Sequence, residues 1–234
     1  MNRALNMLRE WKHLTLLATL LGLIFAQPVA RSGMVGTIVF DVLITIAISV
    51  IFFVVFDRHS TRIAAIALAA PLLVIHWLAR ATGASSTFVF VAEHGVATLF
   101  LGFAVTVVLR GIFQPKKFRA DDLLGVVCGY LLAGLAWGNL YNLADAVSPG
   151  AFSVRSDLAW ELNDESTRRH LFDNFSFVTL TCCGDNKVVP LAQTASSLTW
   201  LEAVFGQFYM AVVVAQLVGL KLSQAVGRSD AADT

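Results

Sequence analysis

The chain has 234 residues, of which 57% are hydrophobic and only 14% are charged, and its mean hydropathy is +0.71. Soluble globular domains carry about 25% charged residues, so this composition excludes an ordinary soluble domain and indicates an integral membrane protein in contact with lipid. The formal net charge of +1 gives no reason to expect a nucleic-acid partner. The three cysteines, two of them adjacent, do not make a disulfide framework.

Apolar segments recur along the chain, and each approaches the roughly 20 residues that a helix needs to span a membrane. We predict six spanning helices, at residues 13–30, 36–56, 61–79, 86–112, 122–147 and 194–222. The first is the shortest, and the basic residues before it are also typical of a signal peptide. We expect this segment to stay in the mature protein as a helix.

The distribution of Lys and Arg predicts the orientation in the membrane, because cytoplasmic loops are enriched in both. The amino terminus and the links at 57–62 and 110–119 are basic, whereas the links at 31–35 and 80–85 carry one arginine each. The basic residues are Arg3, Arg9, Lys12, Arg58, Arg62, Arg110, Lys116, Lys117 and Arg119, against Arg31 and Arg80. We therefore expect a multi-pass protein of the plasma (inner) membrane with both termini in the cytoplasm.

The segment Leu171–Pro190 is too polar to span a membrane and too apolar for an ordinary loop. It follows an exposed segment at 148–170, which we expect outside the cell, and consists of an amphipathic half, two cysteines, a glycine and three polar residues. Irregular backbone at membrane depth is tolerated only where protein buries it or where it lines a water-filled cavity. We therefore predict a re-entrant hairpin, a short helix followed by an irregular strand, and this favours a pore.

The residues FSFVTLTCCGDNKVVP, followed by WLEAVFGQFYMAVVVAQLVG, resemble the pore region of the potassium-channel superfamily. In that family a pore helix ends in a Thr-rich turn, the filter reads Thr-Val-Gly-Tyr-Gly-Asp, and a proline precedes the inner helix. The resemblance covers residues 171–222 well and the preceding helix loosely, and the first four helices match only in number. It implies an all-α membrane protein of six transmembrane helices with a re-entrant pore helix and filter loop. Four copies are needed around one pore, so we expect a homotetramer with membrane lipid as its other partner.

The resemblance also divides the chain into two domains. Residues 1–113 would form a four-helix, sensor-like domain, and residues 114–234 a pore domain of outer helix, pore helix, filter loop, inner helix and short cytoplasmic tail. A voltage sensor needs several basic residues along its fourth helix. Residues 86–109 contain no Lys or Arg, and only Arg110 follows at the edge, so we do not expect steep voltage gating.

The resemblance assigns the selectivity filter to a segment in which most of the family signature differs. The filter residues would be Thr181, Cys182, Cys183, Gly184, Asp185, Asn186 and Lys187. Backbone carbonyls line a potassium filter and require alternating backbone handedness, which Gly184 and Asn186 tolerate. Asp185 stands in place of the tyrosine and cannot supply its aromatic packing. We therefore expect a wider, weakly selective pore for monovalent cations such as K⁺ or Na⁺, with no bound cofactor or metal.

Four residues outside the filter have roles implied by the resemblance. Phe175 and Thr179 would belong to the pore helix that supports the filter, Glu202 would lie behind the filter, and Gly206 would be the flexing point of the inner helix. Gly206 serves close helix packing equally well, and Gly134 with Gly138 forms a small-residue face suited to the same purpose. Glu202 lies near the membrane surface, where a carboxylate costs less than at the centre.

The second, third and fourth apolar segments contain the ionisable residues Asp41, His76, Glu93 and His94. Ionisable groups within a membrane suggest a function such as proton sensing. No regular spacing links these four residues, however, so we favour a simpler interpretation. A carboxylate–histidine pair would hold the four-helix domain together.

Two alternatives to a conducting channel remain open. Lys187 would place positive charge at the pore mouth, and the second filter glycine is lost, which also fits a non-conducting, channel-like protein with a structural or regulatory role. An enzyme with Cys182 or Cys183 as nucleophile lacks a histidine or acid at a telling spacing, so we expect no enzymatic activity. Four copies of Cys182 near one axis would suit a soft ion such as Cu(I), although buried cysteines that only pack are more common.

Overall fold

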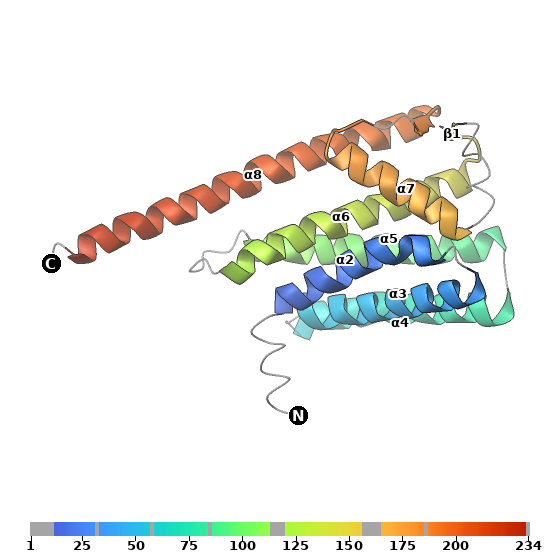
Figure 1. Ribbon diagram of the computed structural model, residues 1–234, viewed down its shortest axis with the longest axis horizontal. Helices are drawn as coiled ribbons and strands as arrows, with labels where there is room; N and C mark the ends of the chain where they lie inside the picture. The colour runs from blue at the N-terminus through green and yellow to red at the C-terminus, as the bar shows by residue number, and fades with distance from the viewer. Residues whose placement is uncertain are drawn as a thin grey trace, which may run out of the picture.

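The computed structural model describes residues 12–30, 33–56, 59–83, 86–112, 120–155, 165–184 and 187–232 (Figure 1). These residues form the helices α2 (Lys12–Ala30), α3 (Met34–Val55), α4 (His59–Thr82), α5 (Thr87–Ile112), α6 (Ala120–Val147), α7 (Glu165–Leu180) and α8 (Gln193–Ala232), with the strands β1 (Phe152–Val154) and β2 (Val188–Pro190). The two strands form a small antiparallel sheet in an otherwise helical chain. The predicted all-α class is confirmed.

Five of the described helices, α3, α4, α5, α6 and α8, are long and apolar enough to cross a membrane. This is consistent with a multi-pass membrane protein. The first predicted span forms α2, but its apolar part, Lys12–Gln27, is shorter than the other five. Of the six predicted spans, the described residues therefore contain five that meet the length and composition of a membrane-crossing helix.

Two predicted boundaries differ from the structure. Helix α8 has 40 residues and continues to Ala232, so the helix extends ten residues beyond the predicted end at 222 and includes most of the predicted tail. At 1.5 Å per residue it is about 60 Å long, roughly twice the thickness of a membrane core, and it projects well beyond the other helices (Figure 1). Helix α7 begins at Glu165, so its first turns come from the segment expected to be an exposed loop.

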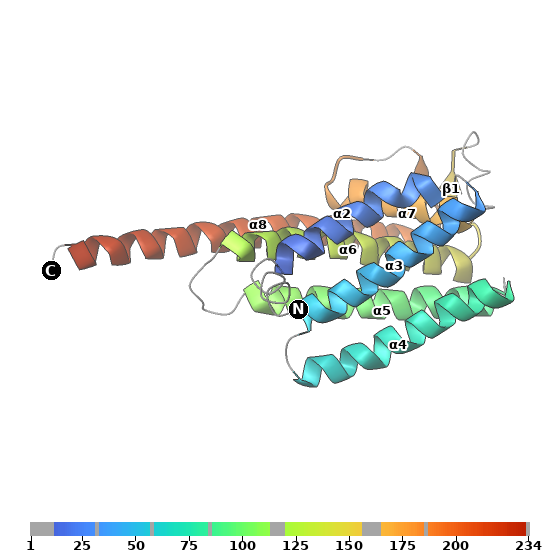
Figure 2. The ribbon, with the colours of Figure 1, turned by 60° about the horizontal axis from the view of Figure 1, so that its bottom comes forward.

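The helices are arranged in two groups with α6 between them (Figures 1 and 2). On one side, α2, α3, α4 and α5 pack with α6 around a single apolar core, whose fully buried members include Leu20, Phe56, Phe100 and Leu132. On the other side, α7 crosses between α6 and α8 (Figure 1). The apolar core thus continues from the first four helices into α6.

The start of α2 and the end of α8 lie at the same end of the helix bundle (Figure 1). Of the basic residues used to predict orientation, Arg3, Arg9, Arg31, Arg58, Lys116, Lys117 and Arg119 lie outside the described residues. The described basic residues Arg62 and Arg110 lie in the first turn of α4 and the last turn of α5, respectively.

Candidate functional site

The candidate site is the segment 181–184, which follows α7 and lies beside α8. Helix α7 has 16 residues and is about 24 Å long, too short to cross a membrane. Its position depends on two glycines of α6. A Cβ atom at Gly138 would meet the side chain and Cα of Asp173, and one at Gly134 would meet the ring of Phe177. The predicted small-residue face is therefore confirmed as the surface on which α7 packs.

The apolar side of α7 packs in an aromatic cluster. Phe172 and Phe175 are buried. The ring of Phe172 lies 5.2 Å from that of Phe152 in β1, and the ring of Phe175 lies 5.1 Å from that of Tyr141 in α6, both edge to face. Edge-to-face contacts of this kind add about 0.5–1.5 kcal/mol each to the burial of the rings. Phe175, predicted to support the filter, thus fixes α7 to α6.

The backbone turns sharply where α7 ends. The amide of Cys182 donates to the carbonyl of Thr179 at 2.9 Å, and the amide of Cys183 donates to that of Val178 at 3.0 Å. Cys182 has a φ of +55° and Gly184 a φ of +78°, while Cys183 between them does not have positive φ. Left-handed backbone costs a residue with a Cβ about 1–2 kcal/mol. The residues of positive φ at 182 and 184 therefore flank one without it, and the hydrogen bonds of Cys182 and Cys183 close the end of α7.

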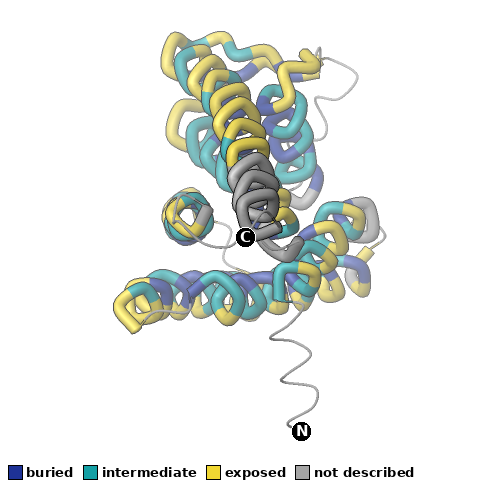
Figure 3. The backbone as a smooth tube through the Cα atoms, turned by 90° about the vertical axis from the view of Figure 1, so that its left-hand side faces the viewer, coloured by how far each residue is buried: buried dark blue, intermediate teal, exposed yellow. Residues whose placement is uncertain are grey.

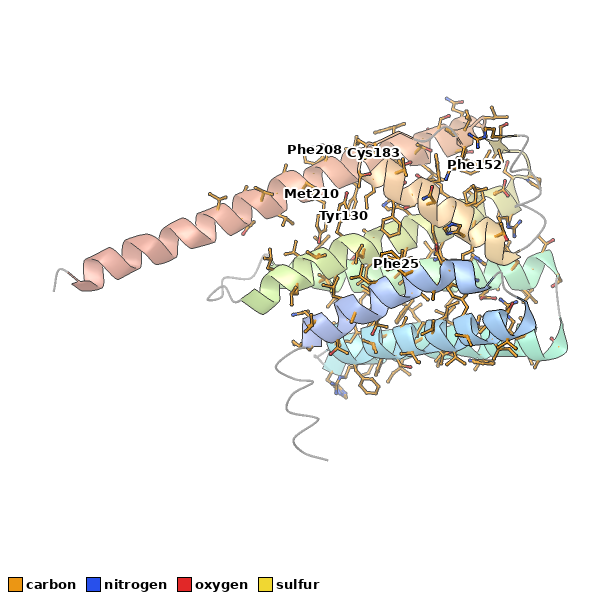
Figure 4. The ribbon with its side chains drawn as sticks, viewed as in Figure 1. Phe25, Tyr130, Phe152, Cys183, Phe208 and Met210 are labelled. Carbon is orange, nitrogen blue, oxygen red and sulfur yellow. The ribbon has the colours of Figure 1, made fainter. Side chains whose placement is uncertain are left out.

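The structure describes five of the seven predicted filter residues. Thr181, Cys182, Cys183, Gly184 and Lys187 are exposed. Cys182 and Cys183 are free thiols, and Cys183 lies at the end of α7 beside α8 (Figure 4). Asp185 and Asn186, which carry the greatest departure from the family signature, lie outside the described residues.

The two strands anchor the far side of this segment. Strand β2 pairs with β1 in the register Phe152–Pro190, Ser153–Val189 and Val154–Val188. The amide of Arg155 also donates to the carbonyl of Lys187 at 2.9 Å. Sequence analysis predicted an irregular strand in the second half of Leu171–Pro190, where β2 lies, but it missed β1 and the pairing of the two strands, because each has only three residues. The sheet ties the segment after residue 187 to the chain just beyond α6.

Glu202 joins the three helices around the candidate site. Its side chain is fully buried in α8. The hydroxyl of Tyr141 in α6 donates to Oε2 at 2.5 Å, and the hydroxyl of Ser176 in α7 lies 2.5 Å from Oε1. Ser176 also lies 2.7 Å from the carbonyl of Gly134. Glu202 therefore connects α8 with α6 and α7. The role in filter support that the resemblance implies for it stays a prediction.

Gly206 lies one turn further along α8, against the end of α7. A Cβ atom at this position would collide with the carbonyl oxygen of Leu180. The hydroxyl of Tyr130 donates to the same carbonyl at 3.1 Å. Helix α8 is continuous through Gly206, so in this structure the glycine permits a close approach between two helices.

We expect Gly206→Ala to lower the free energy of unfolding by roughly 1–3 kcal/mol, because the new methyl group forces α8 away from Leu180. Unfolding in detergent, followed by tryptophan fluorescence, measures this loss. The matched control is Gly219→Ala in the same helix, where a Cβ atom meets nothing within 4 Å and alanine favours the helix by about 0.5–1 kcal/mol. Equal stability of the two variants would contradict the close approach at Gly206.

The structure connects three of the four intramembrane ionisable residues. The His76 ring lies between two carboxylates, with Nδ1 2.9 Å from Glu93 Oε1 and Nε2 3.6 Å from Asp41 Oδ1. The carboxylate–histidine pair that we predicted is thus present. His94 is apart from it, stacked on the ring of Phe90 and directed at that residue's carbonyl.

Sequence analysis missed three residues at the start of α7, because it placed them in an exposed loop. The guanidinium of Arg168 lies over the ring of Phe90, 4.1 Å from its centroid. Arg169 Nη2 lies 3.5 Å from Glu93 Oε1. His170 Nδ1 lies 2.6 Å from the side-chain oxygen of Gln27 in α2. The one available signal was helical spacing, since Thr167, which is buried, precedes Leu171 by one turn on the same face.

The site thus combines a short helix packed on glycines, an exposed turn of alternating handedness, a two-stranded anchor and a buried carboxylate that joins α6, α7 and α8. An ion pair connects the start of α7 to α5, and a hydrogen bond connects it to α2. Comparison with known proteins adds no relative to this description: no protein-family model, no curated protein and no solved structure matches the chain.

Proposed function

We propose that this chain is one subunit of a homotetrameric cation channel of the potassium-channel superfamily, with a weakly selective filter. The observation that carries the proposal is the short helix α7, lodged between α6 and α8 and followed by an exposed turn with left-handed backbone at Cys182 and Gly184. A helix too short to span, followed by irregular backbone among spanning helices, fits a re-entrant segment that lines a water-filled cavity. In this proposal α2 is a sixth span, and both termini lie on the cytoplasmic side of the plasma (inner) membrane.

The exposed surface of α8 supports assembly around a central axis. Large apolar side chains recur on it at helical spacing, and Trp200 is 57% exposed and Phe208 66% exposed. Most of the described part of α8 is exposed in the single chain (Figure 3). Lipid or protein must cover such a surface, and the turn at 181–184 is exposed beside it. Four copies packed through α8 would place four such turns around one axis.

The chemistry of the turn supports weak selectivity for monovalent cations. Backbone carbonyls of Cys182, Cys183 and Gly184 would form the inner ion sites. Asp185 would supply a negative field at the outer side in place of the rigid packing that a tyrosine provides. Buried Glu202 would hold α7 and α8 together behind the turn. No enzymatic step and no bound cofactor enter this proposal.

Cation flux through the purified protein tests the proposal. In planar bilayers, Asp185→Asn is expected to lower the cation current by roughly three- to tenfold at low salt, because it removes a negative charge next to the ion path. The difference should shrink at high salt, which screens the charge. The matched control, Lys187→Gln, removes a positive charge two residues away and is expected to raise the current. Changes of the same sign in both variants, or no change in either, would overturn the role of Asp185.

A non-conducting, channel-like protein with a structural or regulatory role is the second candidate. It is favoured by Lys187, which is exposed directly before β2 and would place positive charge at the mouth of a pore. In this case wild-type protein in liposomes passes no cations, whereas a variant with Thr-Val-Gly-Tyr-Gly-Asp at residues 182–187 does. A monomeric protein in native mass spectrometry would contradict both candidates, because each keeps the tetrameric frame.

A further inference from the structure

A row of charged side chains, with Asp41, His76 and Glu93 buried at its centre, runs from α3 and α4 to the start of α7. Arg80 Nε lies 3.1 Å from Asp41 Oδ2, and Arg169 Nη2 lies 3.5 Å from Glu93 Oε1. His76 lies between the two carboxylates, 3.6 Å and 2.9 Å from their oxygens. We call Arg80, Asp41, His76, Glu93 and Arg169 the junction residues. They connect four helices, and the last of these is α7.

The contacts of the His76 ring determine how many protons it carries. A neutral imidazole has one N–H and one lone pair, whereas an imidazolium has two N–H groups. Both ring nitrogens of His76 face carboxylate oxygens, and within the part of the chain that the structure describes neither Nε2 nor Asp41 Oδ1 has a hydrogen-bond partner. A neutral ring would therefore direct its lone pair at one of these oxygens. A second proton on the ring or a proton on one carboxylate would remove this repulsion. Because the guanidinium of Arg80 stabilises Asp41 as an anion, we place the proton on His76.

The charges of the junction residues alternate when His76 is protonated. In order they are then positive, negative, positive, negative and positive, so that every neighbouring pair attracts. Buried charges are tolerated when they are paired in this way, and breaking one pair by removing a partner is strongly unfavourable. Loss of the proton from His76 removes the central attraction that joins α4 to α3 and α5.

We propose that His76 is a proton-binding site, held as an imidazolium between Asp41 and Glu93, and that its proton fixes the start of α7 through Glu93 and Arg169. The ligand is the proton itself, and the responding element is α7. The proton site and its link to α7 do not depend on ion conduction. Only the interpretation of α7 as a pore helix rests on the proposed function.

A cavity next to the junction residues has room for water beside His76. It has a volume of about 80 Å³ and is lined on its polar side by Gln27, His76, Glu93, His94 and Arg169. A buried water needs about 10–15 Å³ and two to four polar partners, so the cavity has room for several waters. His94 Nε2, which is fully buried and has no hydrogen-bond partner among the described residues, is one such partner.

Other groups around the junction residues titrate or carry charge, and they define the controls. Besides the junction residues they are His94 on α5 and Arg168, His170 and Asp173 on α7, whereas α2 and α6 contribute the neutral side chains of Gln27 and Asn139. Asp173 Oδ2 accepts a hydrogen bond from Gln27 at 2.6 Å.

Asp173 is a neighbouring group whose loss of a proton would also destabilise the folded protein as the pH rises. Burial raises the pKa of this carboxyl from 3.8 to about 7. Its folded-state pKa is above its unfolded value, so its contribution to stability is fully present below about pH 4 and is lost as the pH rises through about 7. Because loss of the His76 proton acts in the same direction, the experiment uses Asp173→Asn as its background.

Hydrogen exchange of α7 in the purified full-length protein, measured by mass spectrometry between about pH 5.5 and about pH 8.5, tests the proposal. After correction for intrinsic exchange rates, α7 in the Asp173→Asn protein is expected to exchange on the order of tenfold faster at the higher pH. Adding His76→Gln, which cannot carry the charge, should abolish this difference. Adding His94→Gln instead should preserve it, because neither ring nitrogen of His94 contacts a carboxylate.

Two results would overturn the proposal: no pH difference in the Asp173→Asn protein, or the same difference after His76→Gln is added. Should His76→Gln fail to fold, His76→Asn replaces it, because its amide nitrogen falls near Nδ1 and can still donate to Glu93.

Nitrogen-15 NMR of the wild type gives an independent measurement of the protonation of His76. The histidine signal lost in His76→Asn should be doubly protonated near pH 6.5, and a singly protonated ring would be decisive against the proposal. Neither measurement requires ion flux, so failure of the proposed channel activity would be recognised separately.

Discussion

Replacing Glu202 by alanine is expected to lower the free energy of unfolding by roughly 2–5 kcal/mol. The side chain is fully buried and meets the hydroxyls of Tyr141 and Ser176, each at 2.5 Å. Removing the carboxylate takes this acceptor from the buried hydroxyl of Tyr141, which costs about 1–3 kcal/mol, and the shortened side chain leaves a cavity. The hydroxyl of Ser176 keeps the carbonyl of Gly134 as a partner. Because the three residues lie on α6, α7 and α8, the loss should appear as loosening of all three helices. Unfolding in detergent, followed by circular dichroism, measures it.

Glu202→Gln is the matched control for this prediction. Glutamine has nearly the same shape as glutamate and retains an oxygen and an amide for the two hydroxyls, so we expect a loss below about 1.5 kcal/mol. A double-mutant cycle of Glu202→Gln with Ser176→Ala would isolate the contact between α8 and α7. If the alanine and glutamine variants unfold at the same denaturant concentration, the carboxylate does not join the helices as the structure indicates.

Gly138→Leu is expected to destabilise the protein by roughly 3 kcal/mol or more, since it forces α7 off the surface of α6. A Cβ atom here would meet the side chain of Asp173, which can rotate, but it would also lie 3.0 Å from the Asp173 Cα, which cannot move without the helix. Overpacking a close contact costs about 1–3 kcal/mol even for a small addition. The same unfolding assay measures the effect.

Gly102→Leu in α5 provides the control for this substitution, because a Cβ atom at Gly102 meets nothing within 4 Å. We expect its effect to stay within about 0.5–1 kcal/mol, as for substitutions away from packed positions. Hydrogen exchange of α7 should rise in the Gly138 variant and stay unchanged in the Gly102 variant. Unchanged exchange in both would show that α7 does not depend on the glycine surface.

Much of the candidate site could be predicted because it depends on local chemistry. Small residues at 134 and 138 predict a close helix contact whatever the partner, and the structure places Phe177 and Asp173 against them. The positive φ of Gly184 follows from the freedom of glycine. The positive φ of Cys182 does not, since only the hydrogen bonds at the end of α7 place a residue with a Cβ in that conformation.

The start of α7 shows why the remainder could not be predicted. Arg168, Arg169 and His170 read as a solvated loop, because charged residues are expensive to bury without partners. Their partners, Phe90, Glu93 and Gln27, lie on α5 and α2, more than seventy positions away in the sequence. Only the packed structure shows that these contacts exist, so the helix starts earlier than its apolar pattern indicates.

By itself, the sequence determined that this protein is mostly helical and where most of its long apolar helices lie, because helix length and apolar content are properties of contiguous residues. Tertiary structure alone decided which buried polar groups meet. Asp41, His76 and Glu93 have no common spacing, and Glu202 is separated from Tyr141 by 61 positions. The physical reason is that the energy of a buried charge depends on what surrounds it in space, and in this protein those surroundings come from different helices.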